Sequence, residues 1–138
     1  MRRPRYVLTA RAAADLREAR AWSLARWGKD LTAGYFDDLH KGAQFIAENQ
    51  SALRRRLELS GGTSLLLHPV REHYIVYGPL AERFIAIVAV IRQGRDVPAI
   101  LQKWSVPIRR ELIEIRGKIE RGEIAWPTQS AGTPRRKK

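Results

Sequence analysis

One stretch dominates the hydrophobic pattern of the chain: residues 83–91 read RFIAIVAVI and hold eight consecutive apolar residues. Many of these are β-branched and apolar side chains occupy both alternating faces, as in a central strand covered on both sides. Just upstream, HYIVY at residues 73–77 predicts a second strand, and the Gly and Pro of residues 78–82 predict the hairpin turn between the two. Residues 65–67 predict a third strand, so the pattern indicates an antiparallel meander.

The first third of the chain predicts a short strand followed by two helices. RYVL at residues 5–8 predicts the strand, and Thr9 is a suitable N-cap for a helix from Ala10 to Trp27 that stops at Gly28. Asp30 can cap a second helix that extends to about Glu48. The buried stripes are expected to be Ala12, Leu16, Ala19 and Ser23 on the first helix, and Tyr35, Leu39, Ala43 and Ile46 on the second. The short link predicts an antiparallel helix hairpin that covers the sheet.

A third helical pattern opens at Pro107, and its apolar stripe consists of Ile108, Leu112, Ile115 and Ile119. This amphipathic helix must bury its stripe on its own sheet, on a second copy of the chain, or under a partner. The polar and basic residues 127–138 predict a disordered tail. We therefore expect an α+β domain at residues 1–104, a helical extension at 105–126 and the tail at 127–138.

Composition narrows the class of protein further. The chain has 138 residues and no cysteine, so one core is sufficient, and neither disulfides nor a cysteine metal site can form. No apolar run reaches the roughly 18 residues of a membrane span, which together with the polar start predicts a cytoplasmic protein with no membrane partner. The net charge is +12, of which the final four residues supply four, leaving a basic body. Such a balance favours a polyanion or an acidic protein as the partner.

Six segments between residues 6 and 101 carry a family resemblance, in order and with short gaps. They are YVLTARAAADL (6–16), ARWG (25–28), AGYFDDL (33–39), FIAENQ (45–50), HPVREHYIVY (68–77) and IRQGRDVPAIL (91–101). This series resembles the ParE branch of the RelE/ParE toxins of bacterial type II toxin–antitoxin modules. The chain departs from many relatives in having apolar Leu66 and Ala89 where they carry arginine, and Arg92 where they carry histidine.

Resemblance to the ParE branch implies a growth-arresting toxin that binds DNA gyrase, traps its cleaved-DNA complex and performs no chemistry on a substrate. It also implies a ParD-like antitoxin whose acidic segment folds along the helix hairpin and the sheet. The RelE branch supplies an alternative, a ribosome-dependent endoribonuclease that cuts messenger RNA. A third alternative, suggested by Leu66 and Ala89, is a member that has lost toxicity and survives as an antitoxin-bound partner.

Polar side chains gather around the ends of the two predicted central strands. If the protein is a nuclease, the resemblance implies catalytic roles for Arg71, His73, Tyr77, Arg92 and Arg95. His73 and Tyr77 share one strand face, but both also fit as ordinary strand residues with their rings in the core. Arg95 and Asp96 have a structural interpretation as well, in which Asp96 caps the following turn and Arg95 pairs with a nearby carboxylate.

If the protein acts by binding alone, exposed aromatic and arginine side chains are the expected anchors. The partner-binding candidates are Trp22, Trp27, Phe36, Arg71, Arg92 and Arg95. Trp22 lies off the apolar stripe of its helix, so packing between the two helices and exposure to a partner are both open. No phosphate-binding glycine loop, nucleophile elbow or paired-carboxylate motif appears, and no cofactor or metal ion is expected.

Overall fold

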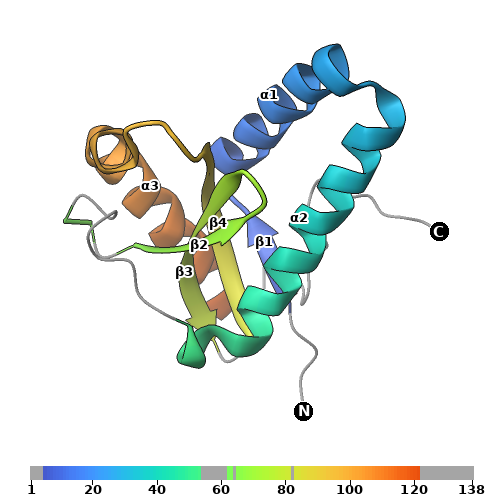
Figure 1. The fold of residues 1–138 in the computed structure, drawn as a ribbon. Coiled ribbons are helices and arrows are strands. Elements are labelled where there is room, and N and C mark those ends of the chain that lie inside the picture. The colour runs from blue at the N-terminus through green and yellow to red at the C-terminus, as the bar shows by residue number, and fades with distance from the viewer. Residues whose placement is uncertain (1–4, 54–61, 64, 82, 122–138) are drawn as a thin grey trace.

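Four strands and three long helices make up the part of the chain that the computed structural model describes, residues 5–53, 62–63, 65–81 and 83–121. In chain order the elements are β1 (Arg5–Leu8), α1 (Ala10–Trp27), α2 (Lys29–Asn49), a 3-10 turn (Gln50–Ala52), β2 (Leu66–Val70), β3 (His73–Ala81), β4 (Phe84–Arg92) and α3 (Val97–Glu120). None of the described helices is long and apolar enough to cross a membrane. The predicted α+β class, with a helix hairpin and a C-terminal helix, is confirmed (Figure 1).

The sheet has the order β1-β4-β3-β2, in which β2, β3 and β4 form the predicted antiparallel meander. β1 lies at the edge of the sheet opposite β2 and pairs with β4 in parallel, with Arg5 opposite Phe84 and Leu8 opposite Ile87. β4 is therefore an inner strand, and its residues from Phe84 to Ile91 are buried on both faces, as the apolar run predicts.

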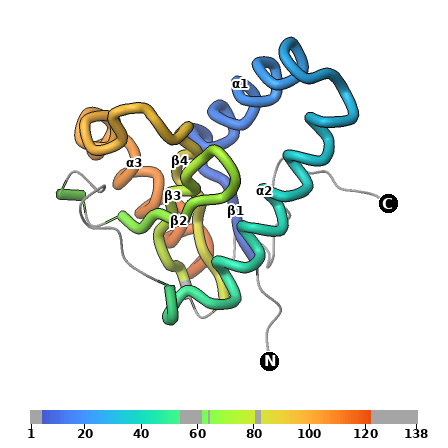
Figure 2. Tube along the Cα trace, viewed as in Figure 1, coloured from blue at the N-terminus to red at the C-terminus, as the bar shows by residue number. Residues whose placement is uncertain are grey.

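The α1–α2 hairpin covers one face of the sheet. The core on this face contains Tyr6, Ala12, Ala43, Ile46, Ala47, Leu66, Ile75, Tyr77, Ile85, Ile87 and Val90. The expected stripe of α2 is buried along its whole length, whereas on α1 only Ala12 and Ser23 are fully buried. Beyond the sheet the two helices converge at Gly28, whose φ of 85° allows the abrupt reversal, and the joined ends project away from the body (Figure 2).

The third helix covers the opposite face of the sheet (Figure 1). The core on this side contains Val7, Leu65, Leu67, Val76, Phe84, Ala86, Val88, Ala89, Ile91, Val97, Leu101, Ile108 and Leu112, with Ile115 and Ile119 packed against it. The stripe predicted on this helix thus packs within the chain and is not available to a second copy.

The expected start of this helix at Pro107 is wrong. α3 begins at Val97, Asp96 is its N-cap through a hydrogen bond from the Ala99 N–H at 3.3 Å, and Pro107 lies inside it. Val97 and Leu101 continue the stripe of Ile108 and Leu112 toward the N-terminus, so burial on both sides of the proline outweighs the lost helical hydrogen bond. The helix also runs without a break past residues 104 and 105, the expected domain boundary. Residues 122–138, which include the expected tail, lie outside the described part.

The expected hairpin turn at residues 78–82 is also wrong, because β3 continues through Gly78 and Pro79 to Ala81. The turn falls instead next to Arg83, which has a φ of 63°. Gly78 is favoured in the strand because the Leu112 side chain of α3 lies against it, 3.3 Å from where a Cβ would be. Pro79 is tolerated because β2 pairs with β3 only as far as Tyr77, which leaves this part of β3 at an edge.

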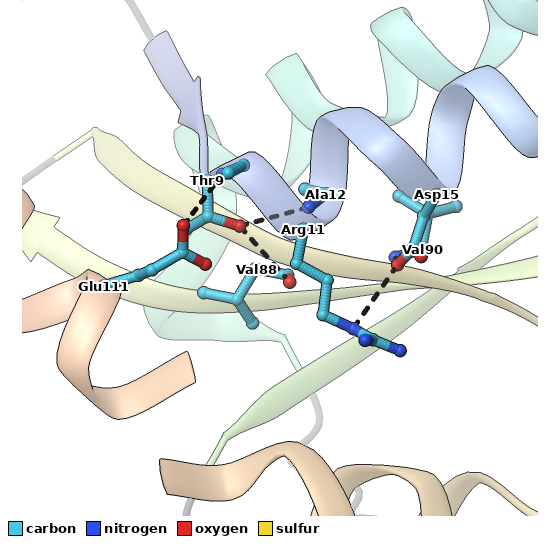
Figure 3. A network of polar contacts seen from close by, with 8 residues as sticks. Thr9, Arg11, Ala12, Asp15, Val88, Val90 and Glu111 are labelled. Atoms are coloured by element: carbon cyan, nitrogen blue, oxygen red, sulfur yellow. Dashed lines mark hydrogen bonds and ion pairs between the residues drawn. The ribbon is translucent and has the colours of Figure 1, made fainter. Parts of the chain in front are cut away.

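Side chains at the start of α1 form hydrogen bonds to the part of β4 that β1 does not reach, and a side chain of α3 holds the start of α1 (Figure 3). Thr9 accepts a hydrogen bond from Ala12 as the N-cap of α1, and its hydroxyl donates to the Val88 carbonyl at 3.4 Å. Further along, an Asp15 carboxylate oxygen accepts from the Val90 N–H at 3.0 Å. From the other side, Glu111 of α3 accepts from the Ala10 N–H at 3.0 Å. These bonds fix the start of α1 between β4 and α3.

The close approach of α2 to β2 gives a stability prediction. A Cβ at Gly42 would lie 2.6 Å from Cγ2 of Val70, whereas a Cβ at Gly34 of the same helix would meet nothing within 4 Å. Ala is the better helix former, so Gly34→Ala should stabilise the protein by up to about 1 kcal/mol. Gly42→Ala should instead be destabilising relative to it by about 1–3 kcal/mol, because the β-branched Val70 cannot turn away. Urea unfolding of both variants checks this, and equal stability would contradict the contact.

Candidate partner-binding site

A buried tyrosine–histidine pair joins α2 to the start of β3. The Tyr35 hydroxyl is hydrogen-bonded to Nδ1 of His73, and it accepts from the Glu72 N–H at 3.2 Å. The amide occupies one acceptor site of the hydroxyl oxygen, and the bond to Nδ1 joins the two side chains in either tautomer of His73. Burial lowers the pKa of His73, the neighbouring Arg92 lowers it further, and Glu72 partly opposes both effects. Burial likewise raises the pKa of Tyr35, so both groups are neutral at physiological pH.

Gln93, just after β4, fastens the β2–β3 turn to this pair. Its side-chain amide donates to the Arg71 carbonyl at 2.9 Å and to the His73 carbonyl at 3.1 Å, and its backbone N–H donates to the Glu72 carbonyl at 2.8 Å. These bonds hold Arg71 in a left-handed conformation, with a φ of 56°. The turn is therefore fixed in position relative to the end of β4.

The Arg71 side chain is engaged on two sides. Its guanidinium forms an ion pair with Asp38 of α2 at 2.5 Å and lies over the Tyr35 ring, 4.8 Å from the ring centroid. The positive charge of Arg71 is thus paired within the chain, which leaves it less available to a partner than the sequence suggested.

Tryptophans and arginines surround the other side of Tyr35. Trp27 packs on Tyr35 with ring centroids 5.6 Å apart, and Trp22 packs edge-on against Trp27 at 5.3 Å. Two guanidinium groups lie over the Trp22 ring, Arg26 at 4.7 Å and Arg92 at 5.1 Å. Trp22 and Trp27 are half-buried. Both expectations for Trp22 are therefore met in part, because it packs beside the helix junction and keeps part of its surface exposed.

Arg95, in the loop between β4 and α3, places a positive charge near Asp15. Burial raises the pKa of the Asp15 carboxyl, while the Val90 N–H and the positive charges of Arg11 and Arg95 act in the opposite direction. Arg11 is 3.9 Å from Asp15, and no ion pair to Arg95 is found among the described residues. The structural interpretation of Asp96 is correct, since it caps α3.

Two of the five nuclease candidates lie inside the protein. His73 and Tyr77 do share the face of β3 that meets the helix hairpin, but both are buried and Tyr77 is only 1% exposed. On the other face α3 covers the sheet with apolar side chains. Leu66 and Ala89, which replace arginines of many relatives, are buried in the two cores. Only Arg71, Arg92 and Arg95 of the five candidates are exposed.

Five of the six expected partner-binding residues meet around Tyr35. Trp27, Phe36 and Arg71 touch its ring directly, and Trp22 and Arg92 form the next layer. The sequence assigned Tyr35 only to the apolar stripe of α2, and Gln93 and Arg26 were not considered. A tyrosine on a buried stripe needs a polar partner for its hydroxyl, and that requirement is the signal that could have drawn attention to Tyr35.

Metal binding finds no support in the described residues, where no group of three or more His, Asp or Glu side chains could hold an ion.

Comparison with known proteins agrees with this architecture. A family model described as the ParE toxin of the type II toxin–antitoxin system parDE matches residues 6–97, and the chain belongs to this family. A search of curated proteins gave no match. Among solved structures, one of the chromosomal ParDE toxin–antitoxin system from P. aeruginosa has the same fold, with a TM-score of 0.53 at 15% identity over 65% of this chain and 96% of that one. Most of α3 lies beyond the matched residues.

Proposed function

We propose that this toxin arrests bacterial growth by binding DNA gyrase in the cytoplasm and stabilising its cleaved-DNA complex. Membership of the ParE family supports this, and the observation that carries it against the RelE alternative is the burial of His73 and Tyr77. An acid or base must reach the reacting hydroxyl within hydrogen-bond distance, and a side chain sealed beneath a helix hairpin cannot do so. The exposed arginines alone can bind an anion but cannot exchange its protons.

We further propose that a ParD-like antitoxin neutralises the toxin by docking on the projecting end of the helix hairpin. Two large apolar side chains are exposed there, Leu24 at 40% and Leu31 at 65%. The half-buried Trp27 and Phe36 lie nearby on the same two helices. Exposed apolar residues beside aromatic anchors are typical of a protein interface, and the basic chain would attract an acidic segment.

A pair of reactions with purified protein tests the gyrase proposal. Gyrase supercoiling and DNA cleavage are measured beside translation of a defined message, each with and without the toxin. We expect loss of supercoiling and gyrase-dependent linear DNA, with translation intact. Cut message and untouched gyrase would overturn the proposal in favour of the nuclease, and inactivity in both reactions would favour the non-toxic member.

The antitoxin surface has its own control. Leu31→Asp should weaken capture of the toxin by the product of a neighbouring antitoxin gene by at least about tenfold, because it places a charge in an apolar contact. Ile113→Asp makes the same change at a site 62% exposed on α3, far along the chain from the hairpin. If both variants bind the antitoxin as well as the unchanged toxin does, the proposed surface is wrong.

A further inference from the structure

Two tryptophans outside the hydrophobic core each hold a pair of cations. Trp104, near the start of α3 and 36% exposed, has the Arg11 guanidinium 4.3 Å above its ring and the Lys103 ammonium at 5.7 Å. Trp22, near the end of α1, has Arg26 and Arg92 over its ring. A cation held against a ring face keeps its N–H donors directed outward, because the guanidinium plane lies on the ring and its edge stays in solvent.

One face of α1 connects the two tryptophans, Trp22 on α1 itself and Trp104 on α3. Arg11, Asp15, Trp22 and Arg26 follow the i, i+4, i+11, i+15 spacing of a single helix face. Arg11 reaches Trp104 at one end and Arg92 reaches Trp22 at the other, while Arg95 lies near Asp15 between them. From Arg11 to Trp22 the helix rises by about 16 Å. We call this surface the α1 stripe.

Most of the charge on the α1 stripe is unpaired. Among the ion pairs of the described residues, none involves Arg26, Arg92, Arg95 or Lys103. The carboxylates beside the stripe are held by backbone amides, Asp15 by the Val90 N–H and Glu111 by the Ala10 N–H, and Asp15 also faces Arg11 at 3.9 Å. Glu18, and Asp96 beside Arg95 in the chain, are exposed acidic side chains near the stripe. The stripe therefore presents a row of positioned donors with little internal neutralisation.

The kind of partner follows from what the stripe lacks. A folded protein or peptide partner needs apolar anchors. The exposed aliphatic side chain of α1, Leu24, is two residues from both Trp22 and Arg26, so it lies on a different face of the helix. The tryptophan faces are already covered by cations, so they are not open platforms for bases. The stripe is therefore a line of cations, and its length of about 16 Å matches about five phosphates of one nucleic-acid strand spaced by about 3.4 Å along the axis.

We propose that the α1 stripe is a binding site for the phosphodiester backbone of nucleic acid, independent of base sequence. Arg26, Arg92, Arg95 and Lys103 contact phosphate oxygens, and Trp22 and Trp104 hold three of these cations in place. At the hairpin end this surface adjoins the docking site proposed for the antitoxin, because Trp22 packs on Trp27, and its binding to nucleic acid does not require gyrase.

Fluorescence anisotropy with the purified full chain tests the site. The probes are mixed-sequence oligomers of about 20 nucleotides, as single-stranded DNA, single-stranded RNA and duplex DNA, titrated from roughly 50 to 200 mM salt. We expect all three to bind, with similar affinities for different sequences. The Arg92→Gln/Arg95→Gln variant should bind at least about tenfold more weakly, and its salt slope on single-stranded probes should fall by about 1.4 for two lost phosphate contacts.

Arg109→Gln/Arg110→Gln is the matched control, since it removes the same charge from exposed positions on the outer part of α3. It should retain most of the affinity. Should Arg92→Gln/Arg95→Gln fail to fold, Arg26→Gln/Lys103→Gln tests the same stripe at its two tryptophans. Equal losses in stripe and control variants would overturn the site, as would the absence of binding at low salt. Binding of a polyglutamate peptide but of no oligonucleotide would overturn nucleic acid as the ligand. Because gyrase is absent from the assay, none of these results bears on the gyrase proposal.

Discussion

Replacing Leu112 by aspartate should lower the free energy of unfolding by more than about 4 kcal/mol, enough to unfold much of the protein at ordinary temperature. Leu112 is 9% exposed, packs among Val76, Ala89 and the other residues of the core under α3, and lies against Gly78. The substitution removes a buried aliphatic side chain and leaves a carboxylate that must be desolvated or protonated. Urea unfolding followed by circular dichroism measures the loss.

The adjacent residue provides the control. Ile113→Asp makes an identical chemical change one position along the same helix, at a side chain 62% exposed to solvent. We expect it to change the free energy of unfolding by no more than about 0.5 kcal/mol. A fully stable Leu112→Asp variant would show that α3 does not pack on the sheet in solution. In that case its apolar stripe would be free for another molecule.

Removing one oxygen atom from Tyr35 should cost about 1–3 kcal/mol of stability. Tyr35→Phe leaves the ring beneath Trp27 and Arg71 unchanged but takes the hydrogen-bond partner from the Glu72 N–H and from Nδ1 of His73. The Nδ1 atom belongs to a buried side chain, so it cannot readily recover the bond from solvent. Tyr35→Ala, which also removes the ring, should be more destabilising, by about 3–5 kcal/mol.

Tyr74→Phe is the control for this change. Tyr74 neighbours His73 on β3 and is half-buried, but its hydroxyl has no hydrogen-bond partner among the described residues. Its removal should leave the free energy of unfolding within about 0.5 kcal/mol of the unchanged protein. If the two phenylalanine variants have the same stability, the Tyr35 hydroxyl does not carry the link between α2 and the β2–β3 turn.

The elements that the sequence predicted well are those in which one physical signal acts alone. α1 has its bounds set by a capping threonine at one end and a glycine with positive φ at the other, and both act within a single turn. β4 is apolar on both faces because it is an inner strand between two layers of helix. In each case the local preference and the tertiary environment agree.

Two errors arose where tertiary packing overrides a proline or a glycine, and a third at the start of α2, which begins at Lys29 with Gly28 as its N-cap and Asp30 inside its first turn. Pro107 stands inside α3 because the helix buries its stripe on both sides of it, from Val97 to Leu112. Gly78 lies inside β3 because the Leu112 side chain of α3 packs against it, and Pro79 lies inside β3 because β2 does not pair with this part of the strand. Neither circumstance can be read from the neighbouring residues, since the deciding contacts come from elsewhere in the chain.

The candidate site was anticipated in its residue types more than in its arrangement. Trp22 and Arg92 were identified individually, whereas Arg11, Arg26 and Trp104 were not, and the pairing of these side chains across α1, β4 and α3 depends on the crossing of those elements. The interaction of Arg71 with Asp38, separated by 33 residues, likewise required the β2–β3 turn to be placed beside α2. The sequence therefore identifies candidate cationic side chains, but only the fold shows which of them are paired with a carboxylate of the same chain.

The parallel pairing of β1 with β4 sets an order of events during synthesis. Arg5 pairs with Phe84 in the sheet, and the Ala10 N–H donates to the side chain of Glu111, 101 residues further along the chain. A ribosome that has released only the helix hairpin has therefore produced an amphipathic segment with no sheet to cover it. Contacts this distant form late, because the closure of a long loop must precede them. The toxin can consequently reach its complete form only when nearly the whole chain has left the ribosome, which gives an antitoxin already present time to meet it as it folds.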